Sequence, residues 1–216
     1  MQVAVIDYGS GNLHSVLQSL KTAVAAQGLP HDCFLTNDAA QVAVADYIVL
    51  PGVGAYADCA QGLANVDGMT EVLQERVIDK ARPFLGICVG MQLMAERGTE
   101  DGITKGLGWL KGSVDKLTPQ QGATLPLKIP HMGWNGLNLT RPHPVFNDIN
   151  DGDAVYFVHS YHLTDGDDDH LLATADYGGR VVAAIGQQNM VGTQFHPEKS
   201  QHIGQRLLAN WLNWKP

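Results

Sequence analysis

One of the three cysteines lies between two glycines, at the border between an apolar stretch and a stretch that can open a helix. The segment FLGICVGMQL covers residues 84–93, and in it Gly86 and Gly90 flank Cys88 at two positions on either side. This spacing is typical of a nucleophile elbow, a strained strand-to-helix turn whose neighbours lack Cβ atoms so that the sulfur projects into solvent. The turn also places Cys88 at a helix N-terminus, where free N–H groups favour a thiolate. A buried structural cysteine is the alternative that this segment leaves open.

A histidine and a glutamate near the C-terminus are spaced as a base and the carboxylate that orients it. Pro197 cannot join a sheet interior, so His196 is expected where a strand ends. Residues i and i+2 of an extended segment face the same side, and His196 and Glu198 can therefore point into one site. A reactive thiol needs such a base, and the base needs a partner that fixes its tautomer. Taken alone, His196 is better explained as a surface residue; together with the elbow, the catalytic interpretation is favoured.

A second glycine-rich segment, LPGVG at residues 50–54, ends another expected strand. The carboxyl ends of parallel strands share one edge of a sheet, and ligand sites of such sheets open on that edge. Gly52 and Gly54 allow the backbone N–H between them, that of Val53, to turn toward an anion. The segment therefore predicts an oxyanion hole for acyl transfer, with an ordinary turn as the alternative.

The elements that must position these residues alternate between strands and helices in the first half of the chain. This pattern predicts an α/β fold with a mostly parallel central sheet and helices on both faces. The second half favours antiparallel additions to the same sheet, and the C-terminal stripe of apolar residues predicts a docked helix. The expected strands are 3–6, 33–35, 47–50, 84–87, 137–139, 155–158, 171–175, 181–185 and 191–195, and the expected helices are 13–27, 71–81, 89–97 and 203–214.

Composition excludes several classes of function. At 216 residues, with no linker and no internal repeat, the chain is expected to form a single domain, residues 1–216. A net charge of −8 with no basic cluster argues against a nucleic-acid partner. No apolar stretch is long enough to span a membrane, no secretory signal is visible, and three cysteines make no disulfide framework, so a cytoplasmic setting is expected. A dinucleotide fingerprint fails at His14, where its third glycine is required.

The elbow cysteine, the PGVG loop and the His-Pro-Glu segment, in this order, resemble the triad (class I) glutamine amidotransferases. Within this family, six segments resemble the glutaminase subunits of imidazole glycerol phosphate synthase: DYGSGNLHSV, LPGVGAY, FLGICVGMQL, IPHMGWN, YFVHSY and GTQFHPEKS. They extend over residues 7–200, nearly the whole chain. IPHMGWN is the segment that favours this subunit over the guanylate, anthranilate and carbamoyl phosphate relatives.

The resemblance implies a role for each matching residue. Cys88 is expected to be the nucleophile, with His196 as base and acid and Glu198 as its orienting residue. The N–H groups of Val53 and Val89 are expected to form the oxyanion hole. For the glutamine substrate, the residues implied are Gln92, Glu100, Ser160 and Tyr161, with Glu96 or Asp101 as alternatives to Glu100 for the amino group.

The implied reaction is hydrolysis of glutamine to glutamate through a thioester, with ammonia passed to a separate cyclase subunit. There it would form imidazole glycerol phosphate and an aminoimidazole carboxamide ribotide. No metal or organic cofactor is implied. The expected partner face contains Met132, Trp134, Asn135 and Lys199. Two other interpretations remain open from the residues: another amidotransferase or cysteine hydrolase on the same elbow, and a non-catalytic regulatory subunit.

Overall fold

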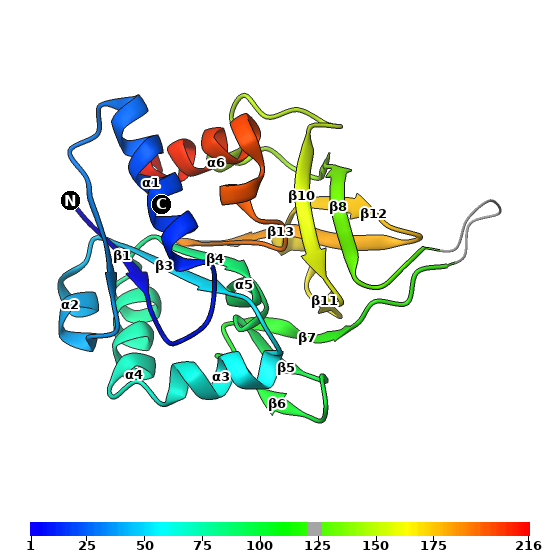
Figure 1. Cartoon of the computed structure of the whole chain (residues 1–216), viewed down its shortest axis with the longest axis horizontal. Helices are drawn as coiled ribbons and strands as arrows, with labels where there is room; N and C mark the ends of the chain where they lie inside the picture. Colours follow the sequence, from blue (N-terminus) through cyan, green and yellow to red (C-terminus); the bar gives the residue numbers. More distant parts are fainter. Residues whose placement is uncertain (121–126) are drawn as a thin grey trace.

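The computed structural model describes residues 1–120 and 127–216, which fold around an eight-stranded sheet (Figure 1). The strand order is β2-β1-β3-β4-β14-β13-β12-β9; β2, β1, β3, β4 and β14 run parallel, and the last three are antiparallel additions. The strands of this sheet are β1 (Gln2–Ile6), β2 (Asp32–Thr36), β3 (Tyr47–Gly52), β4 (Phe84–Cys88), β9 (Asn138–Leu139), β12 (Leu171–Asp176), β13 (Arg180–Gln187) and β14 (Met190–Thr193). The α/β class predicted from the alternating pattern is confirmed.

Helices cover both faces of the sheet, as expected. In Figure 1, α1 and α6 lie together on one face, and α2, α3 and α4 lie on the other. Their bounds are α1 (Leu13–Gln27), α2 (Ala39–Val44), α3 (Tyr56–Ala64), α4 (Met69–Leu73) and α6 (Gln201–Asn213). No helix among residues 1–120 and 127–216 has the length and apolar character needed to cross a bilayer.

Central strands are buried on both faces, which explains why their sequences are apolar runs instead of alternating patterns. Val3 to Ile6 of β1 and Ile48 to Leu50 of β3 have no exposed surface. Helix α1 instead buries one stripe, with Val16 and Leu20 against the sheet, and ends where Gly28 adopts a left-handed φ of 61°.

Three parallel strands bring the expected chemistry to one edge of the sheet. The end of β3 pairs with the end of β4, with Gly52 opposite Cys88. On its other side, β4 pairs with β14, where Ile87 lies opposite Thr193, three residues before His196. The oxyanion loop, the elbow and the histidine thus follow neighbouring strands at their carboxyl ends.

Two smaller sheets stand apart from the main one, so the expectation that all later strands extend a single sheet is wrong. One is the two-stranded β8–β10 ribbon, made of β8 (His131–Gly136) and β10 (Ala154–His159). The other has the order β11-β7-β5-β6, made of β5 (Ala95–Gly98), β6 (Thr104–Lys105), β7 (Leu110–Lys116) and β11 (Tyr161–Thr164). Segment 129–135, where no strand was expected, supplies most of β8.

Two expected helices also differ from the prediction. The helix after the elbow, α5 (Val89–Gln92), ends at Gln92, because Ala95–Gly98 joins the parallel partner β7 as a strand. The helix expected at 71–81 begins at Met69 as α4 and continues as a wider π-helical turn, Gln74–Asp79. Short 3-10 turns complete the chain at Pro144–Phe146, Asp168–His170 and Pro197–Lys199.

Candidate active site

Cys88 occupies a strained corner between β4 and α5. Its φ of 54° and ψ of −110° lie outside the regions that a residue with a side chain prefers, at a cost of about 1–3 kcal/mol. The flanking glycines are needed because the backbone folds tightly on itself: a Cβ at Gly90 would lie 1.7 Å from the Leu50 carbonyl oxygen, and one at Gly86 would lie 2.7 Å from the Gly90 oxygen. The elbow geometry matches the prediction, but Cys88 is only 4% exposed and does not project into open solvent.

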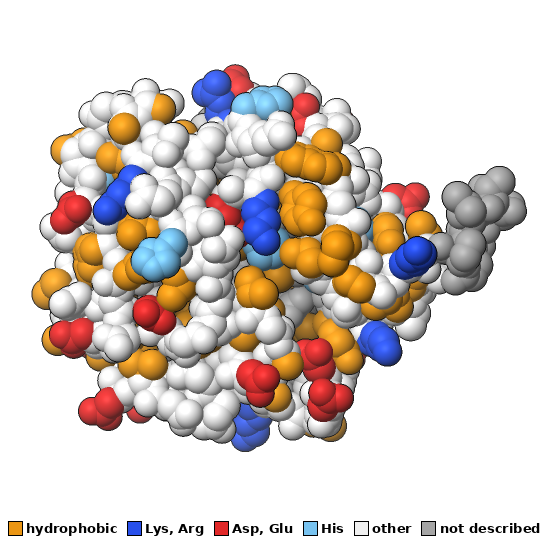
Figure 2. All heavy atoms as spheres, viewed as in Figure 1, with side chains coloured by type: hydrophobic (Ala, Val, Ile, Leu, Met, Phe, Trp, Pro, Cys, Tyr) orange, Lys and Arg blue, Asp and Glu red, His pale blue; other side chains and the backbone are white. Residues whose placement is uncertain are grey.

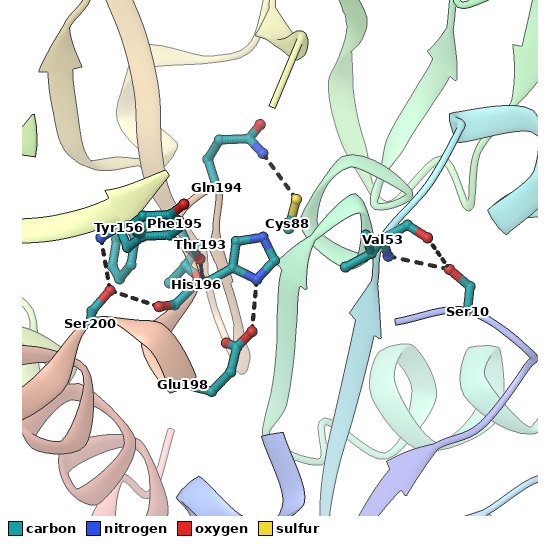
Figure 3. Close-up of polar contacts among 10 residues, drawn as sticks. All are labelled: Ser10, Val53, Cys88, Tyr156, Thr193, Gln194, Phe195, His196, Glu198 and Ser200. Atoms are coloured by element: carbon teal, nitrogen blue, oxygen red, sulfur yellow. Dashed lines mark hydrogen bonds and ion pairs between the residues drawn. The ribbon is translucent and has the colours of Figure 1, made fainter. Parts of the chain in front are cut away.

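His196 and Glu198 form a buried pair beside the thiol (Figure 3). His196 Nδ1 lies 2.8 Å from Glu198 Oε1, and the two side chains are 2% and 1% exposed. The other ring nitrogen, Nε2, points toward Cys88 in Figure 3 and has no hydrogen-bond partner among the described residues. The three side chains are therefore ordered as thiol, imidazole and carboxylate.

The pKa of His196 reflects opposing effects. Burial alone lowers the pKa, but the neighbouring Cys88 and Glu198 side chains outweigh it and raise the pKa of His196 to about 9. Although Nε2 and the thiol do not have the geometry of a hydrogen bond, they are close enough to affect each other electrostatically. An imidazole with a raised pKa readily takes up the proton of a neighbouring thiol.

A glutamine that the sequence reasoning missed also contacts the thiol. Gln194 is fully buried, and its Nε2 lies 3.7 Å from Cys88 Sγ. Its Oε1 accepts a hydrogen bond from Gln92 at 3.1 Å. The same i, i+2 rule that paired His196 with Glu198 places Gln194 on the face of His196, so the signal was present in the alternation.

Eight of the residues predicted for the site line a single cavity of about 230 Å³. These residues come from four segments of the chain, and the fold brings them together around a cavity beside Cys88. They are Val53, Gly54, Cys88, Val89, Gln92, Glu100, Ser160 and Tyr161; the remaining wall is formed by Pro130, Val158 and His159. Gly52, also predicted, is buried at the end of β3, next in sequence to Val53 of this wall.

The three carboxylates considered for binding the amino group of the substrate, those of Glu96, Glu100 and Asp101, lie in different surroundings. Glu100 lines the cavity, and its Oε2 accepts a hydrogen bond of 2.7 Å from Tyr56 N at the start of α3. Glu96 instead accepts from Gly112 N at 3.2 Å, and neither Glu96 nor Asp101 is part of the cavity wall. Glu100 is therefore the best placed of the three. Gln92 is buried, and its amide donates to the Tyr161 carbonyl at 2.9 Å.

Comparison with known proteins agrees with this geometry. Residues 4–214 match the family described as glutamine amidotransferase class-I. The chain belongs to this family. Among its relatives, the imidazole glycerol phosphate synthase subunit HisH of Brucella suis is 55% identical, and that of Mesorhizobium japonicum is 54% identical, each over the full length of both chains. The resemblance inferred from the six segments is thereby confirmed.

Solved structures share the fold of this glutamine amidotransferase at much lower identity. One crystal structure of a glutamine amidotransferase has a TM-score of 0.70 and 16% identity, covering 98% of this chain and 97% of that one. A glutamine amidotransferase from Thermotoga maritima has a TM-score of 0.62 and 17% identity, covering 92% and 76%. These matches concern the fold alone.

In this glutamine amidotransferase, the expected oxyanion donor points away from the thiol. Val53 N donates a hydrogen bond to Ser10 Oγ at 3.2 Å, and the same hydroxyl donates to Val53 O (Figure 3). Ser10 follows β1, whose end lies beside that of β3, so the shared sheet edge explains the contact. From the sequence, the Gly9-Ser10-Gly11 segment was considered only as the start of the failed dinucleotide fingerprint, and this contact was not predicted. Gly52 has a packing role as well, because a Cβ there would lie 2.5 Å from the Tyr8 hydroxyl.

The residues predicted for the partner face are mostly exposed. Met132 is 61% exposed and Trp134 is 49% exposed, so Trp134 is not a core residue. Lys199 Nζ lies 5.9 Å from the ring centre of Tyr156, which in turn makes an edge contact with Trp134. Figure 2 shows hydrophobic side chains gathered over the β8–β10 ribbon, with a basic side chain beside them. Asn135 differs from the others because its side-chain amide donates a hydrogen bond of 2.9 Å to the Asp176 carbonyl oxygen.

Proposed function

We propose that this chain hydrolyses glutamine and supplies the ammonia to a cyclase subunit of imidazole glycerol phosphate synthase, in histidine biosynthesis. The observation that carries the proposal is the order of Cys88, His196 and Glu198, with Cys88 in the wall of a cavity, in a chain of the class-I glutamine amidotransferase family. The HisH relatives, which match the full length of the chain, support the choice of enzyme.

The first half of the reaction transfers the acyl group to sulfur. The reaction starts with the proton of Cys88 on His196, an arrangement that the raised pKa of His196 favours, and the sulfur attacks the side-chain amide carbon of glutamine to form a tetrahedral intermediate. The protonated imidazole then gives its proton to the amide nitrogen, the carbon–nitrogen bond breaks, and ammonia leaves a thioester behind. Glu198 accepts the hydrogen bond of Nδ1–H, which leaves Nε2 as the atom that exchanges protons with the thiol.

The second half returns the enzyme to its starting state. His196 takes a proton from water, whose oxygen attacks the thioester carbon, and the proton then returns to the departing sulfur as glutamate is released. In both halves a negative charge develops on the former amide oxygen. The N–H groups of Val53 and Val89 are the proposed donors to it, and Val53 must first leave Ser10 to act.

The substrate and partner assignments extend the proposal to the surrounding residues. Glu100 is positioned to hold the amino group of glutamine, with Gln92 and the backbone at Ser160 and Tyr161 at the other side of the cavity. The exposed Met132 and Trp134, with Asn135 and Lys199, form the proposed cyclase face. We place the activity in a single domain, residues 1–216, working in the cytoplasm without a metal or organic cofactor.

A reconstitution experiment tests the proposal. The purified chain is assayed for glutamate release alone, with the cyclase subunit, and with the cyclase subunit plus its phosphoribulosyl-formimino substrate. We expect glutamine hydrolysis that rises with both additions and is coupled to imidazole glycerol phosphate. Activity on simple esters or peptides in place of glutamine would favour the general cysteine hydrolase, and binding to a partner without any hydrolysis would favour the regulatory subunit.

A further inference from the structure

Two buried histidines on the neighbouring strands of the β8–β10 ribbon contact each other. His131 of β8 and His159 of β10 are register partners, and their Nδ1 and Nε2 atoms lie 3.0 Å apart. They are only 2% and 6% exposed. The His131 ring is stacked between Phe157 and Tyr177, with ring centres 4.5 and 4.0 Å away. The reaction proposed above uses neither imidazole.

The hydrogen bonds of this pair can run in only one direction when both rings are neutral. His159 Nδ1 lies 2.9 Å from the Tyr161 carbonyl oxygen, which only accepts, so His159 must carry its proton on Nδ1. Its Nε2 is then the acceptor of a proton from His131 Nδ1. His131 Nε2 accepts in turn from the amide of Asn135, at 3.3 Å. Every ring nitrogen of the pair is satisfied in this arrangement.

The surroundings keep both rings neutral near pH 7. Burial lowers the pKa of His131 to about 4. Burial also lowers the pKa of His159 to about 3, opposed by its hydrogen bond to the Tyr161 carbonyl and assisted by nearby histidines. A neutral pair is a fixed set of donors and acceptors, which suits it to hold geometry and not to exchange protons.

The series of hydrogen bonds that starts at Asn135 ends at the wall of the proposed glutamine cavity. The Tyr161 carbonyl accepts from His159 on one side and from Gln92, four residues after Cys88, on the other. Ser160, Tyr161 and His159 all line the cavity. The near end is strand β8, whose opposite side carries the exposed Met132 and Trp134. The pair therefore lies on the buried face of the ribbon and connects β8 to the wall of the cavity.

We infer that His159 and His131 are positioning residues for glutamine binding, which hold the Tyr161 carbonyl and the Ser160–Tyr161 wall in register with strand β8. The inference rests on the proposed glutaminase function, because it concerns the same cavity. A shift of β8 on its exposed face would reach the substrate wall through this pair. Loss of the pair changes how well glutamine is held, and it leaves the thiol chemistry in place.

Three substitutions of His159 separate the two hydrogen bonds. An asparagine amide nitrogen can replace Nδ1 and keep the bond to the Tyr161 carbonyl, whereas a glutamine amide can replace Nε2 and keep only the bond to His131. His159→Phe removes both. In the cyclase complex, we expect His159→Gln and His159→Phe to raise the KM for glutamine about tenfold, with a much smaller change in kcat, because each leaves the Tyr161 carbonyl without this donor. His159→Asn should restore a KM within about threefold of the unsubstituted protein.

His143→Gln is the matched control. His143 is a partly buried histidine that caps the 3-10 turn at Val145 N, with a bond of 3.3 Å, and it lies outside the cavity wall. The His143→Gln substitution should leave the KM for glutamine unchanged. Equal KM values in all three His159 variants, or an equal fall in kcat with KM unchanged, would overturn the inference while the glutaminase assignment stood. If the unsubstituted complex did not hydrolyse glutamine, the proposed function itself would fail. If His159→Phe does not fold, the comparison of Asn with Gln decides alone.

Discussion

Ser10 holds the backbone of Val53 by two hydrogen bonds, one from Val53 N to the hydroxyl and one from the hydroxyl to Val53 O. The N–H expected to stabilise the oxyanion is thus occupied on the side of the loop away from Cys88. The residue before Val53, Gly52, has no Cβ, so the Gly52–Val53 peptide that carries this N–H can change its orientation at low cost. In this arrangement Ser10 opposes the productive orientation of the loop.

Replacing Ser10 should therefore increase glutamine hydrolysis in the absence of the partner. Ser10→Ala removes a contact worth about 0.5–1.5 kcal/mol, so a roughly 2- to 10-fold higher basal kcat is expected from a shifted loop population. Steady-state glutamate release by the isolated chain measures it. Thr22→Ala is the control, because it removes another hydroxyl, bound to the Gln18 carbonyl at 2.9 Å on α1. A basal rate unchanged or lower in Ser10→Ala would show that the hydroxyl does not restrain the loop.

The donor in this loop is a backbone group, so the side chain at position 53 should matter little. Val53→Ala should keep most of the stimulated activity. Val53→Pro lacks the N–H and should lower stimulated turnover by roughly 10²–10³-fold, the usual effect of one lost oxyanion donor. Circular dichroism and affinity for the cyclase must first show that the proline variant is folded and bound. A folded, bound Val53→Pro variant with full activity would mean that this loop is not the oxyanion hole.

The thiol can be tested by separating ammonia production from ammonia use. Cys88→Ala should abolish glutamine-dependent formation of imidazole glycerol phosphate in the complex. The same complex supplied with ammonium should keep its activity, because the cyclase reaction needs ammonia from any source. Cys33→Ala, at a buried cysteine on β2, is a matched control and should retain both activities. Loss of ammonium-driven activity in an assembled Cys88→Ala complex would contradict the proposed division of labour.

The elbow was predictable because it depends on local sequence. Two glycines at fixed spacing around Cys88, and a proline that ends a strand after His196, each restrict the backbone directly. The pairing of Gly52 with Cys88 followed from the rule that parallel strands end at one edge. Most strands of the main sheet were also predicted close to their observed bounds, because their apolar runs are a local feature of the sequence.

The errors arose where non-local pairing decides the structure. Ala95–Gly98 has a helix-compatible sequence, but it becomes β5 because it pairs with β7. Segment 129–135 contains residues typical of turns, yet most of it forms a strand because it pairs with β10. Ser10 was missed because its contact with Val53 joins residues 43 positions apart. Gln194 was missed because the alternation that places it on the face of His196 does not by itself give an amide a chemical role.

The raised pKa of His196 predicts a pH-dependent contribution to stability. A folded-state pKa of about 9 exceeds the ordinary value of 6.5, so the proton on His196 stabilises the folded state fully below about pH 6.5. This contribution is lost as the pH rises through about 9. Glu198→Gln removes the carboxylate that supports the charge, so its destabilisation should be larger at pH 6 than at pH 9.5. Denaturant unfolding at both pH values measures the difference, and a destabilisation independent of pH would contradict a protonated His196.

Trp134 offers the clearest test of the cyclase face. Its side chain is half exposed and contacts Tyr156 edge-on, so removing it leaves no cavity in the core. Aromatic anchors at interfaces typically contribute about 2 kcal/mol or more, and Trp134→Ala should therefore weaken cyclase binding by roughly 30-fold. Ile103→Ala is the control, because Ile103 is 80% exposed in the turn before β6 and lies outside the proposed face. Titration calorimetry gives the affinities, and the melting temperature of the isolated chain should change little in either variant. A large fall in melting temperature with unchanged affinity would assign Trp134 a structural role in the β8–β10 ribbon instead.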